Sequence, residues 1–422
     1  MVFNEKLQEL VDCTNQKLAD DLGDYRRKPI FRVTEKYIKI DKQAYTPLCL
    51  SIGPYHYPKG EGKEYILKDV IRFGCPLDDY YSKLISHEQE FRDYYEKIQP
   101  EISPDFLQIL LLDSVFLLWL TNLISENEEC NGPELTIDHY RDIFLVENQI
   151  PFDVLNKVFA TAHGERQEQP FALLLVEGLK WYFDSLMIPM VAPDMDTDPV
   201  HLLHLVHRSL VPVKGRNISS DVRCNQNQQD QKFLRWHRAV EYHQAGVQFK
   251  KMDLQSPHTL LDIEFKNGVL SIPRFSIDEL TQDFFRNLVT FELLTPDRGV
   301  RKYVTAYIIF MSQLLSTPGD VTLLYQKEII DYQLGRANHV CELFQNLAQG
   351  LPGINKSYYE MSFGRKLEKH YSNRWNKWMA WLKHKHFKNP WLILALLAAT
   401  LLLVCTILQT FFSVFCYAKP PH

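Results

Sequence analysis

The sequence predicts a mainly α protein: a multi-helix globular body with a small antiparallel β-sheet, followed by a single C-terminal transmembrane helix. Three observations lead to this fold class. Residues 389–418 contain no charged side chain and no histidine. Apolar residues recur every three or four positions through much of the preceding chain, which is typical of amphipathic helices. An Asn-Gly pair at positions 267 and 268 separates two short alternating segments, which predicts a β-hairpin with a type I′ turn.

Residues 389–418 are the predicted membrane anchor. A bilayer core about 30 Å thick is spanned by about 20 apolar residues in a helix, so this run is long enough to cross it. Basic residues precede the run at 374, 377, 383, 385 and 388, whereas only Lys419 follows it. The positive-inside bias therefore places the body on the cytosolic side of the plasma membrane or an endomembrane. Because residues 1–10 lack an apolar signal-peptide core, we expect a tail-anchored, single-pass protein.

The segment 355–388 is predicted to be a basic, tryptophan-rich helix before the anchor. Leu367, Tyr371 and Trp375 begin a stripe of apolar residues at helical spacing. One interpretation places this helix among anionic lipid headgroups, and the other docks its stripe on the body. In the first interpretation the lipid bilayer is the partner of Trp375, Trp378, Trp381, Lys383, Lys385, Lys388 and Trp391.

Charge, cysteine spacing and missing motifs argue against several functional classes. The formal net charge of −5 and the pI near 6.3 give no overall basic surface, which argues against nucleic-acid binding. The eight cysteines are dispersed without a Cys-x-x-Cys pair, which suits a reducing compartment and argues against a zinc site or a disulfide framework. P-loop, dinucleotide-binding, metalloprotease and nucleophile-elbow motifs are absent. We therefore expect no cofactor, and an enzyme is the less favoured class.

After a polar N-terminal segment, 1–28, the sequence predicts a single mostly helical domain, 29–388. Near its start the motif Ser-Ile-Gly-Pro-Tyr-His predicts a strand-like segment that ends in a tight turn. Its candidate structural residues are Ser51, Gly53, Pro54, Tyr55 and His56. We interpret them as a rigid loop packed on the core, and the alternative puts Tyr55 and His56 in a pocket.

The apolar run at 104–124 requires a decision between a core helix and a second membrane span. Asp113 lies at its centre, where a carboxylate in a bilayer costs about 3 kcal/mol. We therefore predict a buried helix whose Asp113 finds hydrogen-bond partners. Downstream, Pro151 is expected to start a helix at 152–161, preceded by Glu147, Asn148 and Gln149 as partners for unpaired helix-end groups. Glu147 and Asp113 could alternatively form an acid–base pair, but the structural interpretation is preferred.

Residues 163–231 are the least regular part of the sequence and are predicted to form a variable surface segment. Within it, Asp198 is expected to cap a helix that starts at Pro199. His201, His204 and His207 follow at spacings of three, so they fan around the helix and are a weak metal-binding candidate.

The remaining domain is predicted as a small sheet followed by helices. The sheet covers 245–274 and includes the hairpin with the Asn-Gly turn. Helices are expected at 277–294, 301–315, 321–330 and 337–347, separated by Pro and Gly residues.

Taken together, an ordered series of motifs resembles the plant domain-of-unknown-function family 247. The motifs lie at 44–56, 111–116, 146–152, 262–273, 286–292 and 391–417, and the resemblance covers about 30 to 417. Thr34 stands where the family usually has proline, and the pattern after the Gly-Pro-Tyr-His turn is blurred around 64–71. The resemblance implies a land-plant, mostly helical, single-pass membrane protein without established catalytic residues. Some grass members of that family are implicated as pollen-side determinants of self-incompatibility.

Three functions follow as hypotheses. The first is a membrane-anchored recognition or signalling protein whose segment 163–231 contacts an unknown protein partner, with self-incompatibility as the implied context. The alternative is a membrane-tethered enzyme with a polar pocket formed by Asp113, Glu147 and His56. A small-molecule sensor is a third hypothesis. Glycosylation sequons at Asn217 and Asn355 would be used only if the body faced the lumen or the cell exterior.

Overall fold

The structure is a computed structural model of the 422-residue chain. It describes residues 29–57, 76–96, 98, 105–124, 136–164, 169–193, 197–216, 235–252, 257–295, 300–332, 336–352, 357–374, 377–378 and 390–418. The predicted polar segment 1–28 lies outside these residues. Within these residues the chain is mainly helical, with two small sheets and one long apolar C-terminal helix.

The first half of the body surrounds one apolar helix, α6. Twelve of its fifteen residues are buried, including Asp113 and Ser114, and it packs against α4 and α8. This arrangement confirms the prediction of a core helix rather than a second span. The helices of this half are α2 (Glu35–Ile38), α4 (Leu77–Ile85), α5 (Glu88–Arg92), α6 (Phe106–Leu120), α7 (Ile137–Ile143), α8 (Phe152–His163), α9 (Phe171–Ser185), α10 (Leu202–Leu210) and α11 (Val213–Arg216).

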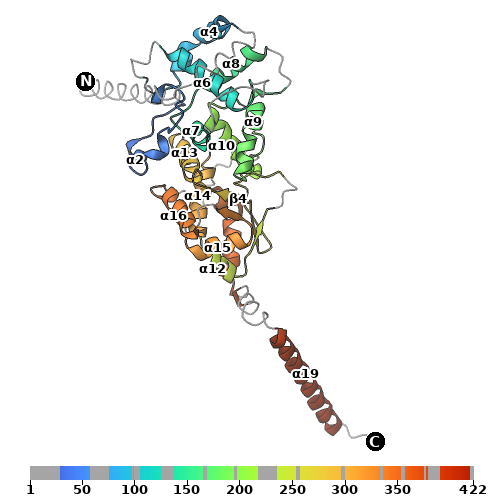
Figure 1. Cartoon of the computed structure of the whole chain (residues 1–422). Helices are drawn as coiled ribbons and strands as arrows, with labels where there is room; N and C mark the ends of the chain where they lie inside the picture. The colour runs from blue at the N-terminus through green and yellow to red at the C-terminus, as the bar shows by residue number, and fades with distance from the viewer. Residues whose placement is uncertain are drawn as a thin grey trace, which may run out of the picture.

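The second half is a cluster of helices around α14 and α16, which pack on each other and on α13 and α15. Its helices are α12 (Ala239–Gln244), α13 (Thr281–Leu294), α14 (Tyr303–Leu314), α15 (Pro318–Gln326), α16 (Ala337–Ala348) and α17 (Arg365–Ser372). Figure 1 shows α7, α10 and α13 between the two halves. Helix α13 packs against α10 and against the turn Gln43–Tyr45, so it connects the halves.

The first sheet contains the predicted hairpin but is mixed rather than antiparallel. Strands β2 (Glu264–Lys266) and β3 (Val269–Ile272) pair antiparallel across Asn267 and Gly268, both with positive φ, as the Asn-Gly turn predicts. Strand β1 (Gln248–Lys251) runs parallel to β3 on its other edge. The prediction of an antiparallel sheet is therefore wrong for β1. The alternation of polar and apolar residues predicts a strand but does not specify its direction.

A second sheet was not predicted. Strands β4 (Phe275–Ile277) and β5 (Ile330–Tyr332) pair in parallel. All three β4 residues are buried, so this short segment has no alternation that would distinguish it from the helix predicted at 277–294. The Asp278 carboxylate accepts hydrogen bonds from the backbone N–H groups of Leu280 and Thr281, and α13 begins at Thr281.

In its described residues, segment 163–231 contains the expected helix, α10, and also a helix that was not predicted, α9. The cap of α10 is also different: His201, not Asp198, is the N-cap, and its Nδ1 accepts a hydrogen bond from the backbone N–H of His204 at 3.2 Å. The carbonyl of Val200 instead accepts from the backbone N–H of Phe152 at 2.8 Å. This contact ties the chain just before α10 to the start of α8.

The basic helix predicted at 355–388 is interrupted at Asn373, and Arg374, Lys377 and Trp378 beyond it are helical again. A π-helical turn (Glu360–Gly364) leads into α17, and Asn373 then takes an extended conformation. Leu367 is buried, and the Tyr371 ring stacks on His237 with centroids 3.8 Å apart, so this part of the stripe docks on the body. Trp378 is half exposed. Trp375, Trp381, Lys383, Lys385, Lys388 and the side chain of Trp391 lie outside the described residues.

The C-terminal helix α19 (Pro390–Ala418) is long and apolar enough to cross a membrane. No part of its most apolar window, Leu397–Val414, is buried against the rest of the chain. In Figure 1 it lies apart from the helical body.

Candidate functional site

The polar motif residues predicted from the sequence meet where loop 47–56 lies against loop 141–151. Asp142, fully buried, accepts hydrogen bonds from the backbone N–H groups of three consecutive residues at 2.7 to 2.9 Å. The three donors are Leu48, Cys49 and Leu50. Its other oxygen accepts from the Arg141 guanidinium at 2.8 Å, so the buried negative charge is compensated.

Asn148 joins the same two loops through both ends of its amide. Its oxygen accepts from the Ile52 N–H at 2.6 Å, while its nitrogen donates to the carbonyls of Leu50 and Asp142. The next residue, Gly53, is also bound through its backbone, because its N–H donates to Asp113 Oδ2 at 2.6 Å. This contact connects the 51–56 motif to the core helix α6.

Gln149 forms hydrogen bonds with three further segments: the end of α7 and the residues after it, the start of α10, and the chain at Tyr95. Its side-chain nitrogen donates to the carbonyls of Ile143 and Leu145, and its side-chain oxygen accepts from the Leu203 N–H at the start of α10. Its backbone carbonyl accepts from the Tyr95 hydroxyl at 3.1 Å. Pro151 then stands at the N-cap of α8, as predicted.

Glu147 lies at the edge of this network. Its Oε1 accepts from the Val33 N–H at 2.6 Å, and its Oε2 lies 3.3 Å from both Arg32 Nη1 and His56 Nε2. The Arg32 guanidinium lies over the Tyr55 ring, 4.0 Å from its centroid. The buried His56 Nε2 is therefore within ion-pair distance of Glu147 Oε2. In the described part of the chain, however, its orientation does not meet the requirements of a hydrogen bond.

Pro54 and Tyr55 are buried in the turn that follows Gly53, and Ser51 is buried before it. The Tyr55 hydroxyl donates to the Ile30 carbonyl and accepts from the Glu96 N–H. Burial raises the pKa of neighbouring Tyr95, so its phenol stays neutral. The rigid-loop interpretation of 51–56 therefore fits this geometry better than a pocket with Tyr55 exposed in it.

This network holds Asp113 and Glu147 against separate backbone segments rather than against each other. Each carboxylate accepts a short hydrogen bond from a main-chain N–H, which fixes it as a structural acceptor. A general base must instead reach a proton of the substrate. The geometry therefore gives no specific support to the acid–base alternative.

The three predicted histidines do not converge on a common point. His201 caps α10, His204 Nδ1 accepts from the Val200 N–H, and His207 Nε2 lies 2.8 Å from Glu292 Oε1. All three rings surround Phe291, at centroid distances of 5.2 to 5.6 Å. Within the described part of the chain, no group of three or more His, Cys, Asp or Glu residues is arranged to hold a metal ion.

Two polar residues of α13 have roles that the sequence did not reveal. Glu292, fully buried, accepts from the N–H groups of Val304 and Thr305 and so caps α14. Asn287 accepts from the Val146 N–H and donates to the Ala44 carbonyl, which fastens loop 141–151 and the turn Gln43–Tyr45 to α13. The sequence pattern that could have indicated these roles is the presence of strongly polar residues on the apolar side of the helix predicted at 277–294.

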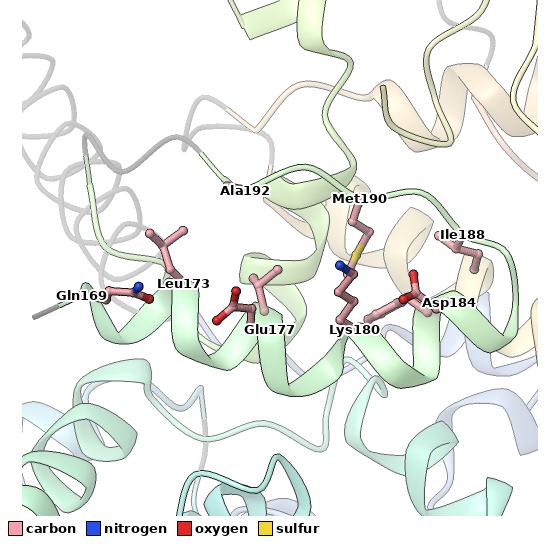
Figure 2. A pocket seen from close by; sticks show the side chains of 10 residues that line it. Gln169, Leu173, Glu177, Lys180, Asp184, Ile188, Met190 and Ala192 are labelled. Atoms are coloured by element: carbon pink, nitrogen blue, oxygen red, sulfur yellow. The ribbon is translucent and has the colours of Figure 1, made fainter. Parts of the chain in front are cut away.

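The other site feature is a cavity of about 480 Å³ between α9 and the segment that follows it. Figure 2 shows Leu173, Glu177, Lys180 and Asp184 on α9, with Met190 and Ala192 across the opening. The lining residues are Gln169, Leu173, Val176, Glu177, Lys180, Phe183, Asp184, Ile188, Met190 and Ala192. All of them fall within 163–231. We call this feature the α9 groove.

The α9 groove combines an apolar lining with a charged rim. Glu177, Lys180 and Asp184 occur at spacings of three and four, so they lie along one side of α9. On the adjacent side, Trp181 is 67% exposed and its ring lies 5.4 Å from that of Tyr140. The sequence predicted partner contact for segment 163–231 but did not reveal the groove, because the segment was expected to be irregular.

Comparisons with known proteins support the family resemblance and add no activity. A family model described as a plant protein of unknown function, domain-of-unknown-function family 247, matches residues 30–405. The UPF0481 protein At3g47200 of Arabidopsis thaliana is 25% identical over 92% of this chain and 86% of its own length. The putative UPF0481 protein At3g02645 of the same plant is 22% identical over 92% and 90%. No solved structure matches the chain.

Proposed function

The chain belongs to the plant domain-of-unknown-function family 247, and on that premise we propose that it is a membrane-anchored recognition protein that binds a protein partner. The α9 groove is the observation that carries the proposal. An apolar cavity with a charged rim is typical of a binding surface. The polar motif residues, by contrast, are engaged in holding the fold together.

The groove suits a protein partner because apolar and charged contacts are available side by side. Leu173, Val176 and Met190 offer an apolar surface, and Trp181 adds an exposed aromatic ring, a residue type enriched at interaction hot spots. Glu177, Lys180 and Asp184 alternate in charge along the rim, which would favour a partner of complementary pattern.

A site-specific photo-crosslinker tests partner binding. We expect the crosslinker at position 176, in the full-length chain expressed in plant tissue, to give one discrete protein adduct. The substitution Met190→Arg should abolish the adduct, because it places a charge in the apolar lining. The matched control carries the crosslinker at the exposed Gln345 of α16. An adduct of equal yield from position 345, or one that survives Met190→Arg, would contradict binding in the groove.

The proposed role also requires α19 to span the membrane with the body on the cytosolic side. The support is the length and exposure of α19 and the basic residues that precede it. We expect the chain to remain in the membrane fraction after alkaline carbonate extraction. We also expect Asn217 and Asn355 to stay unglycosylated, and a mass shift on endoglycosidase treatment would reverse the proposed orientation.

The family resemblance extends the proposal to self-incompatibility, with recognition of pollen as the context. In that role the partner-binding segment should differ between alleles, because recognition must separate self from non-self. Exchanging residues 169–192 between two alleles should then exchange compatibility in reciprocal pollinations. Unchanged compatibility after the exchange would remove the support for this extension.

A further inference from the structure

The most distinctive unexplained feature of α19 is an unpaired amide in its apolar sequence. Three threonine hydroxyls in the helix donate to carbonyls of their own helix, at 2.7 to 2.8 Å. These are Thr400, Thr406 and Thr410. Gln409, in contrast, has no hydrogen-bond partner in the described part of the chain, although it carries two donors and an acceptor. It lies inside the most apolar window, Leu397–Val414.

Gln409 lies on the side of α19 that carries its smaller residues. Ala399, Thr406, Gln409 and Ser413 follow one another at spacings of seven, three and four, and Leu402 completes the row. These spacings form the repeat of three and four that places residues on one helical face. The opposite face is bulky and exposed, and it consists of Leu397, Leu401, Val404, Leu408 and Phe411.

We propose that α19 pairs with α19 of a second copy of this chain through the face formed by Ala399, Leu402, Thr406, Gln409 and Ser413. The proposal rests on the proposed insertion of α19 into the membrane. An amide in hydrocarbon is unfavourable without a partner, so Gln409 requires a donor and an acceptor at its own depth. A small-residue face then allows two helix backbones to approach closely.

A second copy of the chain meets this requirement better than an unrelated helix. Copies inserted in one orientation place their Gln409 residues at the same depth. The amide is self-complementary, because the N–H of each can donate to the carbonyl oxygen of the other. A two-fold axis parallel to the helices generates both hydrogen bonds at once, as in other symmetric dimers. The spacing of three and four favours a left-handed pair.

Energy transfer between two labelled populations of the full-length chain tests this pairing. Donor- and acceptor-labelled protein is co-reconstituted into phosphatidylcholine vesicles over a range of protein-to-lipid ratios. We expect Gln409→Leu to raise the ratio at half-maximal transfer by about tenfold, because the interhelical hydrogen bonds are lost. Gln409→Asn should keep the wild-type ratio, and Leu408→Ala on the opposite face should do the same.

A second pair of variants tests the close approach without touching the amide. Ala399→Leu adds bulk to the paired face and should weaken transfer, whereas Thr400→Leu adds bulk away from that face and should not. Gln409→Leu makes the helix more apolar, so weaker transfer cannot come from poorer insertion. Transfer that is absent in the wild type, or unchanged by both Gln409→Leu and Ala399→Leu, would overturn the pairing.

Alkaline extraction of the same vesicles separates this inference from the proposed function. If the wild-type chain is released into the supernatant, the anchoring proposal fails and the pairing fails with it. If the chain stays in the vesicles but the variants do not alter transfer, the pairing alone is wrong. Retention in the vesicles with selective loss of transfer in Gln409→Leu supports both.

Discussion

Asp142, Glu147 and Glu292 show how buried carboxylates organise this chain. Asp142 and Glu147 accept hydrogen bonds from backbone N–H groups 93 and 114 positions away in the sequence, whereas Glu292 accepts from the start of α14, 12 positions away. The N–H groups bound to Asp142 and Glu147 lie outside regular helices and sheets, and those bound to Glu292 belong to the first turn of α14. All of them lack a helix or sheet partner and would be costly to bury without an acceptor. The sequence indicated that Glu147, Asn148 and Asp113 need partners, but it could not name them. The partners depend on tertiary contacts across as many as 114 positions.

Gly53 provides the sharpest residue-scale prediction. Its φ is +72°, and a Cβ atom at this position would lie 2.5 Å from the Gln149 carbonyl oxygen. Gly53→Ala should therefore destabilise the protein by about 2 kcal/mol or more, through backbone strain and a clash that the buried loop cannot relieve. The measurement is the free energy of unfolding in urea, with the full chain in detergent micelles.

Gly164 is the matched control for Gly53. Its φ is also positive, at +77°, but no atom lies within 4 Å of the added Cβ position. Gly164→Ala should cost only about 1 kcal/mol, from backbone strain alone. Equal losses at the two positions would show that the contact with Gln149 has no energetic role.

Among the elements, helices were predicted better than strands for a physical reason. A helix is defined by contacts within one segment, so its periodicity is visible in the sequence, as for α6, α14 and α16. The parallel pairs β1–β3 and β4–β5 depend on a partner elsewhere in the chain, and their direction leaves no local signal. The α9 groove likewise forms between a helix and the segment folded back over it, so no motif marks it.

Helix α15 carries an element-scale prediction at its first turn. The Thr317 hydroxyl donates to Asp320 Oδ2 at 2.6 Å within a capping box, and Asp320 Oδ1 accepts from the Val240 N–H of α12. Thr317→Ala should lower the free energy of unfolding by about 1 kcal/mol, because the cap is lost. Asp320→Ala should cost about 2 to 3 kcal/mol, since it also leaves the Val240 N–H without its acceptor.

Thr322→Ala on the exposed side of α15 is the control for these variants, and urea unfolding is again the measurement. It should leave stability nearly unchanged, because alanine is the better helix former. If Asp320→Ala cost no more than Thr317→Ala, the link between α12 and α15 would carry no free energy.

At the scale of the whole molecule, the core contains tyrosines that are fully enclosed, among them Tyr307 and Tyr359. Burial disfavours the phenolate and raises the pKa of both. Aromatic content suggested a well-packed body, but the sequence could not show which tyrosines are enclosed. Enclosure depends on separate helices meeting, as α13 and α14 do around Tyr307.

These tyrosines make the stability of the whole body sensitive to alkali. Above pH of about 10, the unfolded state loses phenolic protons that the folded state retains. A raised folded pKa therefore contributes stability that is complete below pH 10 and is lost as pH rises further. Each buried tyrosine should add about 1.4 kcal/mol of destabilisation per pH unit above 10. The measurement is the free energy of unfolding in urea between pH 8 and pH 11.

Tyr307→Phe isolates one of these groups. In the part of the chain that the structure describes, the buried Tyr307 hydroxyl has no hydrogen-bond partner, so its removal should be neutral or slightly stabilising at pH 7. At pH 11 the variant should lose about 1.4 kcal/mol less than the wild type, because one titrating group is gone. Phe310→Leu, a core change without a titratable group, should lower stability equally at both pH values. An identical alkaline loss in wild type and Tyr307→Phe would mean that this phenol ionises equally readily in both states and is not enclosed.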